Sequence, residues 1–217
     1  GHITTTDIVG TWAGLRPLVK DATSNRTADL SRRHKVTRSP SGVVTITGGK
    51  LTTYREMAAD TVDDVIGYLG ALDHPVSKRS LTRKLRLRGA RGYEDEAGRE
   101  EALADRYGGE AAAVRALVAD DPALGEPLVP GLPYLRAEAV YAARHEMART
   151  LDDVLTRRTR ARLLARDASA EAAADVAALL APELGWDDAE QQRQVADYQA
   201  SIDHERASAD LPLSDPE

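Results

Sequence analysis

The most regular hydrophobic pattern of the chain begins at residues 43–47, where Val-Val-Thr-Ile-Thr is β-branched at every position. Such side chains favour extended backbone, so this run predicts a buried strand. Gly48 and Gly49 follow it and allow the positive φ angles of a tight turn. Apolar residues then recur at three- and four-residue steps, as on one helix face: Met57, Val62, Val65, Ile66 and Leu69. The pattern predicts strand, tight turn and helix in succession.

Two earlier segments also have the pattern of strands. Residues 34–38 alternate between polar and apolar, and Ser-Pro-Ser-Gly at 39–42 supplies turn chemistry, so we expect a β-hairpin with the strand at 43–47. Another strand is expected over residues 7–15. Pro17 ends it and pushes Arg16 into extended backbone at a strand end, a common place for a ligand-facing side chain. The alternative for Arg16 is a surface arginine paired with a nearby carboxylate.

From residue 95 onward the pattern is helical almost throughout, which predicts a small all-α domain. One or two helices are interrupted at Gly108-Gly109, and later helices are predicted over about 136–149, 151–166, 171–184 and 188–206. Gly185 ends the third of these four helices, and Asp187 with Glu190 forms a capping box for the last.

Composition narrows the function classes. The net charge of −6 and the pI near 5.5 argue against a general nucleic-acid-binding surface. The absence of cysteine excludes disulfides, zinc-thiolate sites and a cysteine nucleophile, and fits a reducing, intracellular setting. No apolar stretch approaches the roughly 18–20 residues of a membrane span. His145-Glu146 lacks a second histidine four residues after the first, since residue 149 is arginine, so we expect no metal site.

The candidate chemistry lies at the glycine turn. The first N–H groups of a helix have no partner within the helix, and with the macrodipole they suit a phosphate, a carboxylate or a developing negative charge. Lys50 adds a full positive charge at this point. Paired glycines also serve as plain strand-to-helix punctuation, and the pattern alone leaves both interpretations open. His34 is an acid/base candidate only by residue type.

Seven stretches carry recognisable motifs in a fixed order: TWAGLRPL at 11–18, SRRH at 31–34, SPSG at 39–42, GGKLTTYR at 48–55, PYLRAE at 133–138, YAARHEMA at 141–148 and LDDVLTRRTR at 151–160. Together they resemble the C-terminal part of FAD-dependent (aerobic) glycerol-3-phosphate dehydrogenase. The resemblance covers roughly residues 7 to 165 and is most specific at the glycine-lysine motif.

The resemblance implies an α+β fold. A C-terminal remnant of an FAD-binding α/β domain, a β-hairpin plus helix, would be followed by an all-α helical domain. The implied divisions are residues 1–72 for the FAD- and substrate-binding part, 73–94 for a linker, 95–210 for the helical domain and 211–217 for a tail. The dinucleotide fingerprint Gly-x-Gly-x-x-Gly does not occur in the sequence, so FAD binding would need a missing N-terminal portion. A remnant alone would expose strand edges and apolar surface.

The same resemblance implies roles for individual residues. Arg16 and Lys50 match substrate-pocket residues and become the candidate catalytic and substrate-binding groups. Their charges suit a phosphorylated three-carbon alcohol. The candidate cofactor-binding residues are Gly48, Gly49, Lys50, Leu51, Thr52 and Thr53.

The implied activity is oxidation of sn-glycerol 3-phosphate to dihydroxyacetone phosphate by hydride transfer to FAD, with electrons passed to a quinone. Two alternatives stay open: a glycerol-3-phosphate oxidase that uses oxygen, and, for the isolated chain, a non-catalytic helical interaction module. We expect the isolated chain to be inactive. Further expectations are a cytoplasmic location with peripheral contact on the inner face of the membrane, a homodimer and no nucleic-acid partner.

One basic patch in the helical part remains: Arg157, Arg158, Arg160, Arg162 and Arg166. We expect it to form ion pairs with the many carboxylates of this part. The alternative is a site for membrane phospholipid or for the rest of the enzyme.

Overall fold

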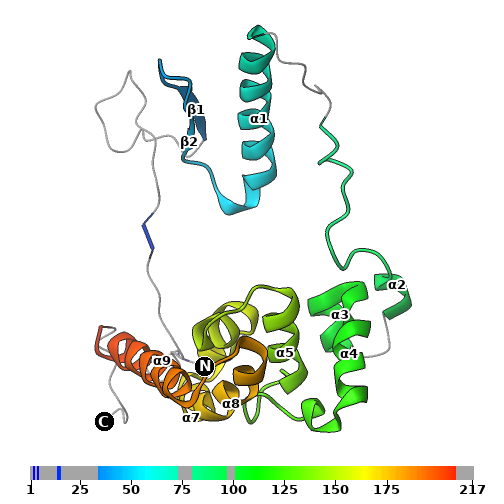
Figure 1. Cartoon of the computed structure of the whole chain (residues 1–217), viewed down its shortest axis with the longest axis vertical. Helices are drawn as coiled ribbons and strands as arrows, with labels where there is room; N and C mark the ends of the chain where they lie inside the picture. The colour runs from blue at the N-terminus through cyan, green and yellow to red at the C-terminus, as the bar shows by residue number, and fades with distance from the viewer. Residues whose placement is uncertain are drawn as a thin grey trace. The chain divides into compact units, whose positions relative to one another are not determined.

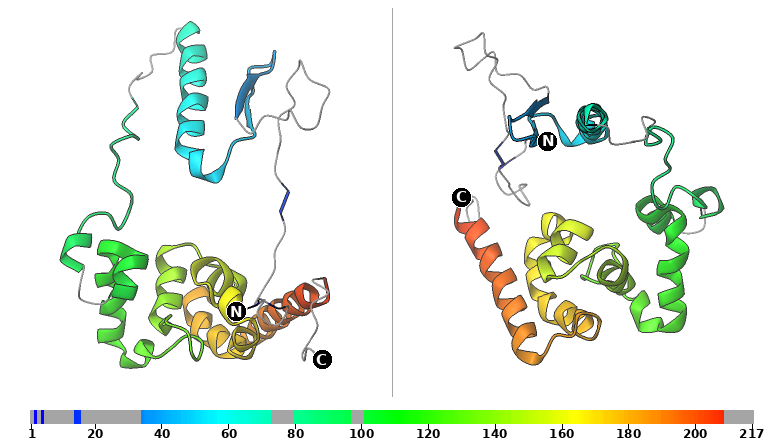
Figure 2. Two further views of the ribbon diagram at one scale, coloured as in Figure 1. Left: turned by 180° about the vertical axis from the view of Figure 1, so that it is seen from behind. Right: turned by 45° about the horizontal axis from the view of Figure 1, so that its top comes forward.

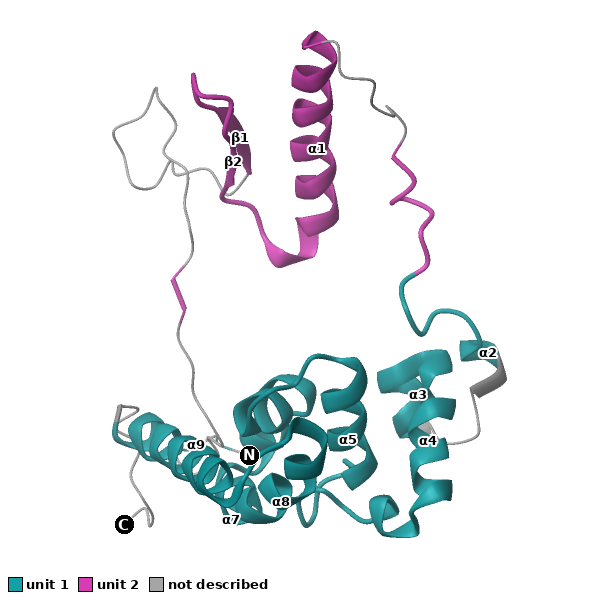
Figure 3. Ribbon diagram, in the orientation of Figure 1, with its two compact units in different colours: residues 1–12, 87–217 teal, residues 13–86 magenta. Residues whose placement is uncertain are grey.

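The computed structural model describes residues 34–72, 80–96 and 101–208, together with His2, Thr4, Gly14 and Leu15 (Figure 1). The candidate residue Arg16, most of the strand expected over residues 7–15 and the predicted tail lie outside the described residues. The chain divides into two compact units, residues 13–86 and residues 1–12 with 87–217 (Figure 3). We call them the hairpin unit and the helical unit.

The hairpin unit contains the predicted hairpin. Strands β1 (Lys35–Arg38) and β2 (Val44–Thr47) pair antiparallel, with Val36 opposite Ile46. The turn between them closes because Ser39 N–H donates to the Val43 carbonyl at 2.9 Å and the Ser39 hydroxyl accepts from Val43 N–H at 3.1 Å. After the glycine pair come the 3-10 turn η3 (Leu51–Thr53) and helix α1 (Tyr54–Ala71).

Polar contacts join α1 to the hairpin, and both views in Figure 2 show the two side by side. The His34 and Asp60 side chains meet at 2.6 Å between Nε2 and Oδ2. Asp64, one helical turn after Asp60, lies 3.6 Å from Arg38, and the Arg38 guanidinium lies over the ring of Tyr68. The hairpin and the helix are therefore held at a defined register.

The prediction that the strand at 43–47 is buried was wrong. In the described part of the hairpin unit no residue is fully buried, and β2 alternates between half-buried and exposed positions. One helix against two strands covers only one face of the sheet. Large apolar side chains are correspondingly open to solvent, including Val43 at 61%, Leu51 at 87% and Val62 at 53%.

The helical unit begins with short helices around two glycines. Its first elements are α2 (Tyr93–Glu96), α3 (Glu101–Tyr107), η4 (Gly108–Glu110), α4 (Ala111–Asp120), η5 (Pro122–Gly125) and α5 (Arg136–His145). The interruption predicted at Gly108-Gly109 is confirmed. Gly109 N–H donates to the carbonyl of Gly89 at 2.8 Å, and the Arg88 guanidinium bonds to Glu110 at 2.8 Å. The segment just before α2 is thus attached to this unit.

The rest of the helical unit packs around α5 and α8. Its elements are the π-helix η6 (Asp153–Arg158), α6 (Ala161–Leu164), α7 (Arg166–Glu171), α8 (Ala173–Leu184) and α9 (Asp188–Ser208). The main core consists of small and aliphatic side chains such as Leu151, Leu155, Val176 and Leu180, all almost fully buried. Close helix contacts are possible because many core positions are alanine. The α+β class predicted from the sequence is confirmed.

Two of the predicted helices are shorter than expected. The helix over 136–149 ends at His145, because Met147 takes a left-handed φ of 63° and the Ala142 carbonyl accepts from the N–H groups of both Glu146 and Ala148. The prediction of one continuous helix over residues 151–166 was wrong. Thr159 donates its N–H (2.9 Å) and its hydroxyl (2.8 Å) to the Val154 carbonyl, which closes a five-residue π turn and stops the helix.

The last two helices agree better with the pattern. Gly185 has the left-handed φ of 69° expected of a helix-ending glycine. Glu190 N–H donates to the Asp187 carboxylate at 2.8 Å, which is one half of the predicted capping box. The Glu190 side chain itself turns away to Arg193 and Gln194. No helix among the described residues is long and apolar enough to cross a bilayer.

Candidate functional site

The candidate site is the turn that connects β2 to α1. Gly48 and Gly49 both have a φ of 77°, and Lys50 returns to extended backbone with φ −140° and ψ 156°. Two successive left-handed residues reverse the chain within the length of the turn. The turn places the start of η3 and α1 directly after the end of β2.

Only glycine fits at position 49. Its φ of 77° disfavours any other residue, and a Cβ there would lie 2.5 Å from the Met57 sulfur and 3.3 Å from the His34 Cβ. Met57 and His34 thus press against the inner side of the turn.

The helix start is fixed by hydrogen bonds around Lys50 and Thr53. Thr53 donates its N–H and its hydroxyl to the Lys50 carbonyl, each at 3.0 Å, and its hydroxyl oxygen accepts from Lys50 N–H at 3.3 Å. Leu51 and Thr52 are the first residues of the turn, so their N–H groups have no partner within the helix. Positive electrostatic potential gathers at this point.

The Lys50 side chain is exposed and forms no ion pair or hydrogen bond within the described part of the chain. An ammonium group without a carboxylate partner is free to bind an anion. Leu51 beside it is almost fully exposed, an unusual position for a large apolar residue.

Behind the turn lies a residue that the sequence analysis missed. Asp60 bonds to His34, so His34 joins β1 to α1 and is engaged in an ion pair or hydrogen bond. Asp60 follows Met57 by three residues and shares its helix face, so the helical pattern contained a signal for it.

The predicted cofactor residues Gly48, Gly49, Lys50, Leu51, Thr52 and Thr53 therefore form one continuous turn, in which Lys50, Leu51 and Thr52 are exposed and the other three are half-buried. The structure gives no position for Arg16. Arg55, the last residue of the glycine-lysine motif, is half-buried and reaches the hydroxyl of Thr82 at 3.5 Å. Among the described residues no group of three His, Cys, Asp or Glu side chains could hold a metal ion.

Comparison with known proteins places this chain in a family. The model for the C-terminal domain of alpha-glycerophosphate oxidase matches residues 67–191, more than half of the chain. The chain belongs to this family. The resemblance of its sequence to the C-terminal part of FAD-dependent glycerol-3-phosphate dehydrogenase is confirmed.

Named relatives extend the match upstream of the family model. Glycerol-3-phosphate dehydrogenase 2 of Mycobacterium tuberculosis is 39% identical over 224 residues, which covers 97% of this chain and 37% of that protein. A mitochondrial glycerol-3-phosphate dehydrogenase of Arabidopsis thaliana is 34% identical over 235 residues, again 97% of the chain and 37% of the relative. Because 97% of the chain is matched, the glycine turn lies within the aligned region.

A solved structure is also similar. The glycerol-3-phosphate dehydrogenase of Bacillus halodurans, in complex with FAD, superposes with a TM-score of 0.63 at 29% identity and covers 84% of this chain. The chain spans 39% of that structure and 37% of the two relatives above. It thus corresponds to a little over a third of the length of these proteins.

Proposed function

We propose that this chain supplies the C-terminal part of an FAD-dependent glycerol-3-phosphate dehydrogenase, which oxidises sn-glycerol 3-phosphate to dihydroxyacetone phosphate. The observation that carries the proposal is the turn from Gly48 to Thr53, which joins two glycines, a helix start and an exposed lysine that pairs with no described residue. The names of the aligned relatives support the substrate.

The turn fits the edge of a flavin ring. Gly48 and Gly49 allow a flat ring to approach the backbone, and a side chain at position 49 would displace Met57. When bound, FAD would supply the acceptor for the hydride from C2 of the substrate. The N–H groups of Leu51 and Thr52 would stabilise the negative charge that develops beside the turn, without reorganisation.

Lys50 has two roles in this proposal. Its ammonium would bind the substrate, and its charge would stabilise negative charge on the C2 oxygen. Arg16 is proposed as the second cation, because the planar guanidinium can bind two phosphate oxygens at once.

The electron acceptor has two candidates. We propose a quinone, reached from the inner membrane face by a cytoplasmic enzyme that forms a homodimer. Oxygen is the second candidate, because the matching family model is described by an oxidase. Hydrogen peroxide formed in step with substrate oxidation would distinguish the oxidase from the dehydrogenase.

The test is a chimera in which this chain replaces the aligned C-terminal region of the Mycobacterium tuberculosis relative. We expect the purified chimera to show flavin absorbance and to reduce a redox dye when glycerol 3-phosphate is added. The isolated chain should do neither, because its sequence lacks the Gly-x-Gly-x-x-Gly fingerprint. A folded chimera that holds flavin but ignores glycerol 3-phosphate would refute the substrate assignment. Peroxide formation or dye reduction by the isolated chain would refute the proposal that the chain needs the rest of the enzyme for activity.

A further inference from the structure

The helical unit contains a cavity of about 560 Å³ that the proposed function does not use. Its lining includes residues of α3, of the end of the π-helix η6, of the two residues that follow η6, and of the end of α6. Its lining is rich in arginine and consists of Asp105, Arg106, Tyr107, Tyr134, Glu146, Arg157, Arg158, Thr159, Arg160 and Leu164.

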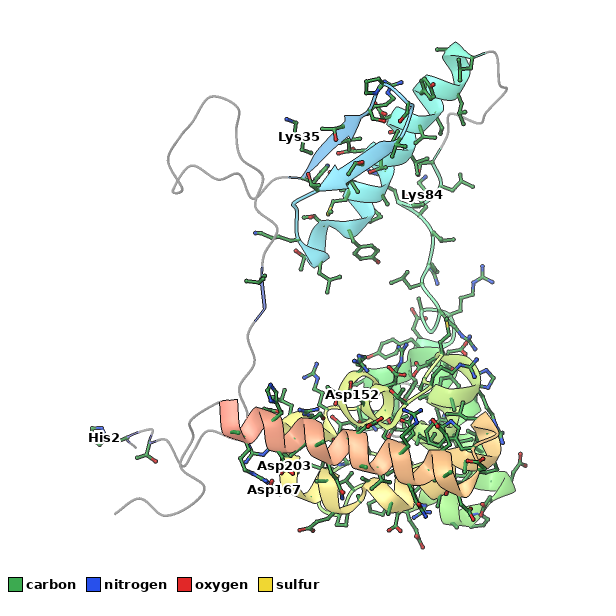
Figure 4. All side chains as sticks on the ribbon, turned by 60° about the vertical axis from the view of Figure 1, so that its left-hand side comes forward. His2, Lys35, Lys84, Asp152, Asp167 and Asp203 are labelled. Atoms are coloured by element: carbon green, nitrogen blue, oxygen red, sulfur yellow. The ribbon has the colours of Figure 1, made fainter. Side chains whose placement is uncertain are left out.

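Two of the four arginines are already neutralised. Arg106 forms a bidentate pair with the buried Glu138, at 2.8 and 2.6 Å. Arg157 bonds to Asp152 at 2.6 Å and to Asp153 at 2.8 Å. Asp152 is labelled in Figure 4 on the helical unit. The ion pairing expected for the basic patch is therefore confirmed at Arg157.

Arg158 and Arg160 differ from the other two arginines. Within the described part of the chain neither has a carboxylate oxygen within 4 Å of its guanidinium. Arg158 donates to the backbone carbonyl of Glu146 at 2.5 Å, which orients its side chain and leaves its charge uncompensated by a direct ion pair. Arg160 makes no hydrogen bond through its side chain to any described residue.

The backbone holds these two side chains beside the cavity. Thr159, between them, is buried and bonded to Val154, while both arginines are exposed. The π turn before Thr159 and the left-handed Met147 opposite are both uncommon, and such features gather at functional sites. In this segment the buried Thr159 fixes the backbone, and the Arg158 and Arg160 side chains on either side of it are exposed to solvent.

Two carboxylates also line the cavity, and they limit the ligand. Asp105 is exposed on α3. Glu146 is half-buried, and burial raises its pKa against the opposing charge of Arg158. Since Arg106 and Arg157 are paired with carboxylates outside the lining, Arg158 and Arg160 are the lining cations left without a direct ion pair to a described residue. With Asp105 and Glu146 in the same lining, a compact anion that reaches both guanidinium groups is favoured over a long anionic surface.

We propose that this cavity binds a phosphate group through Arg158 and Arg160. Two guanidinium forks can together contact several oxygens of one phosphate, which carries up to two negative charges, more than one carboxylate offers. A volume of about 560 Å³ exceeds that of a bare phosphate ion, so the group belongs to a phosphorylated small molecule or to a lipid headgroup. The site lies in the helical unit and does not depend on Lys50.

Isothermal titration calorimetry on the 217-residue chain at constant ionic strength tests the proposal. The probes are inorganic phosphate, glycerol 3-phosphate and sulfate, and co-sedimentation with phosphatidylglycerol vesicles tests the lipid headgroup. The variant R158A/R160A should bind phosphate about tenfold more weakly or worse. The matched control R193A/R206A removes the same charge from arginines outside the cavity and should bind like the wild type.

Three further results decide the outcome. Glu146→Gln removes a negative charge from the lining and should tighten phosphate binding. Binding that is lost in Lys50→Ala but kept in R158A/R160A overturns the proposal, as does equal binding of sulfate or an equal loss in the control. Vesicle binding that phosphate competes away assigns the group to a lipid, and binding of the soluble probes alone assigns it to a free metabolite.

Folding of the variants is checked by circular dichroism. If R158A/R160A is misfolded because the bond of Arg158 to the Glu146 carbonyl is lost, Arg160→Ala alone gives the test, since the Arg160 side chain makes no hydrogen bond to any described residue. The single variant should still weaken phosphate binding several-fold. Unchanged affinity in a folded Arg160→Ala protein would refute the role of this residue.

Discussion

At the scale of single residues, Gly49 is the position where backbone and packing agree most closely. Its left-handed φ and the nearby Met57 sulfur both exclude a side chain. The sequence predicted the need for glycine from the strand that ends before it and the helix that starts after it. It could not show that Met57 and His34 fill the space behind the turn, because that contact depends on how α1 lies against the hairpin.

Gly49→Ala should therefore destabilise the hairpin unit by about 1–2 kcal/mol, from the left-handed conformation and the displaced methionine. Hydrogen exchange of peptides from residues 34–72, measured by mass spectrometry, reports on this unit directly. Gly67→Ala is the control. Gly67 lies in α1 with open space around it, so the change should leave protection the same or raise it. Equal loss of protection in both variants would contradict the packing described for the turn.

Asp153 gives a prediction for the dependence of stability on pH. Burial alone would raise its pKa, but hydrogen bonds from the N–H groups of Arg149 and Thr150 and the charge of Arg157 outweigh burial, and the pKa is lowered. A carboxyl whose pKa is lower in the folded state stabilises the protein above its unfolded pKa, and this contribution disappears as pH falls through the folded pKa.

Asp153→Asn should accordingly cost about 1 kcal/mol of unfolding free energy at neutral pH, and this cost should shrink as the pH falls below the ordinary pKa of an aspartate and through the lowered folded-state pKa. Urea unfolding of the chain across this pH range measures the difference. The exposed Asp175, which has no side-chain hydrogen bond to a described residue, is the matched control as Asp175→Asn. A difference that persists unchanged at acid pH would show that the carboxylate charge is not what stabilises this segment.

At the scale of elements, the buried pair between Arg106 and Glu138 joins α3 to α5. The Glu138 side chain is fully buried, and one of its oxygens also accepts from Leu135 N–H at 2.8 Å, which caps α5. The Arg106 guanidinium lies over the ring of Tyr134. Burial and the neighbouring Glu138 raise the pKa of Tyr107, so this phenol stays protonated beside the pair.

Glu138→Gln should therefore lower the unfolding free energy by about 3 kcal/mol, because it leaves a half-buried guanidinium without its counter-charge. Urea denaturation gives the value. Glu183→Gln, which breaks the more exposed pair with Arg144, should cost less than about 1 kcal/mol. If the double variant Arg106→Met with Glu138→Leu is no more stable than either single change, the loss is not due to an unpaired charge.

Local sequence patterns predicted the elements well where local signals decide. The hairpin, the glycine turn, α1, the break at Gly108-Gly109 and the end of α8 at Gly185 all follow from turn residues or helical periodicity. The pattern failed at Thr159, where a buried hydroxyl bonds to Val154 and ends the helix in a π turn. It also failed at Met147, because a left-handed methionine has no signature in the sequence.

At the scale of the whole molecule, the two units are stabilised differently. The helical unit has a continuous core from α5 to α9, and its surface pairs include Arg206 between Asp167 and Asp203, two residues labelled in Figure 4. The described part of the hairpin unit has no fully buried residue. The composition of the chain could not predict this contrast, since the apolar pattern of the strand at 43–47 is the same whether or not a second sheet face is covered.

The difference in burial between the two units agrees with the fact that the chain spans about 37% of the length of these two relatives. We propose that in the whole enzyme the exposed apolar residues of the hairpin unit, such as Leu51 and Val62, would be covered by the flavin-binding portion. In this proposal the glycine turn would lie at the edge of that contact.

The most direct test of the account is the kcat/KM for glycerol 3-phosphate of the chimera with the Mycobacterium tuberculosis relative, with and without Lys50→Ala. Loss of a charge-assisted bond to the substrate predicts a decrease of about 10- to 100-fold with flavin absorbance retained. Lys35→Ala, at the exposed lysine labelled on β1 in Figure 4, is the control and should change nothing. Equal kcat/KM in the two variants would contradict a role for the glycine turn in catalysis.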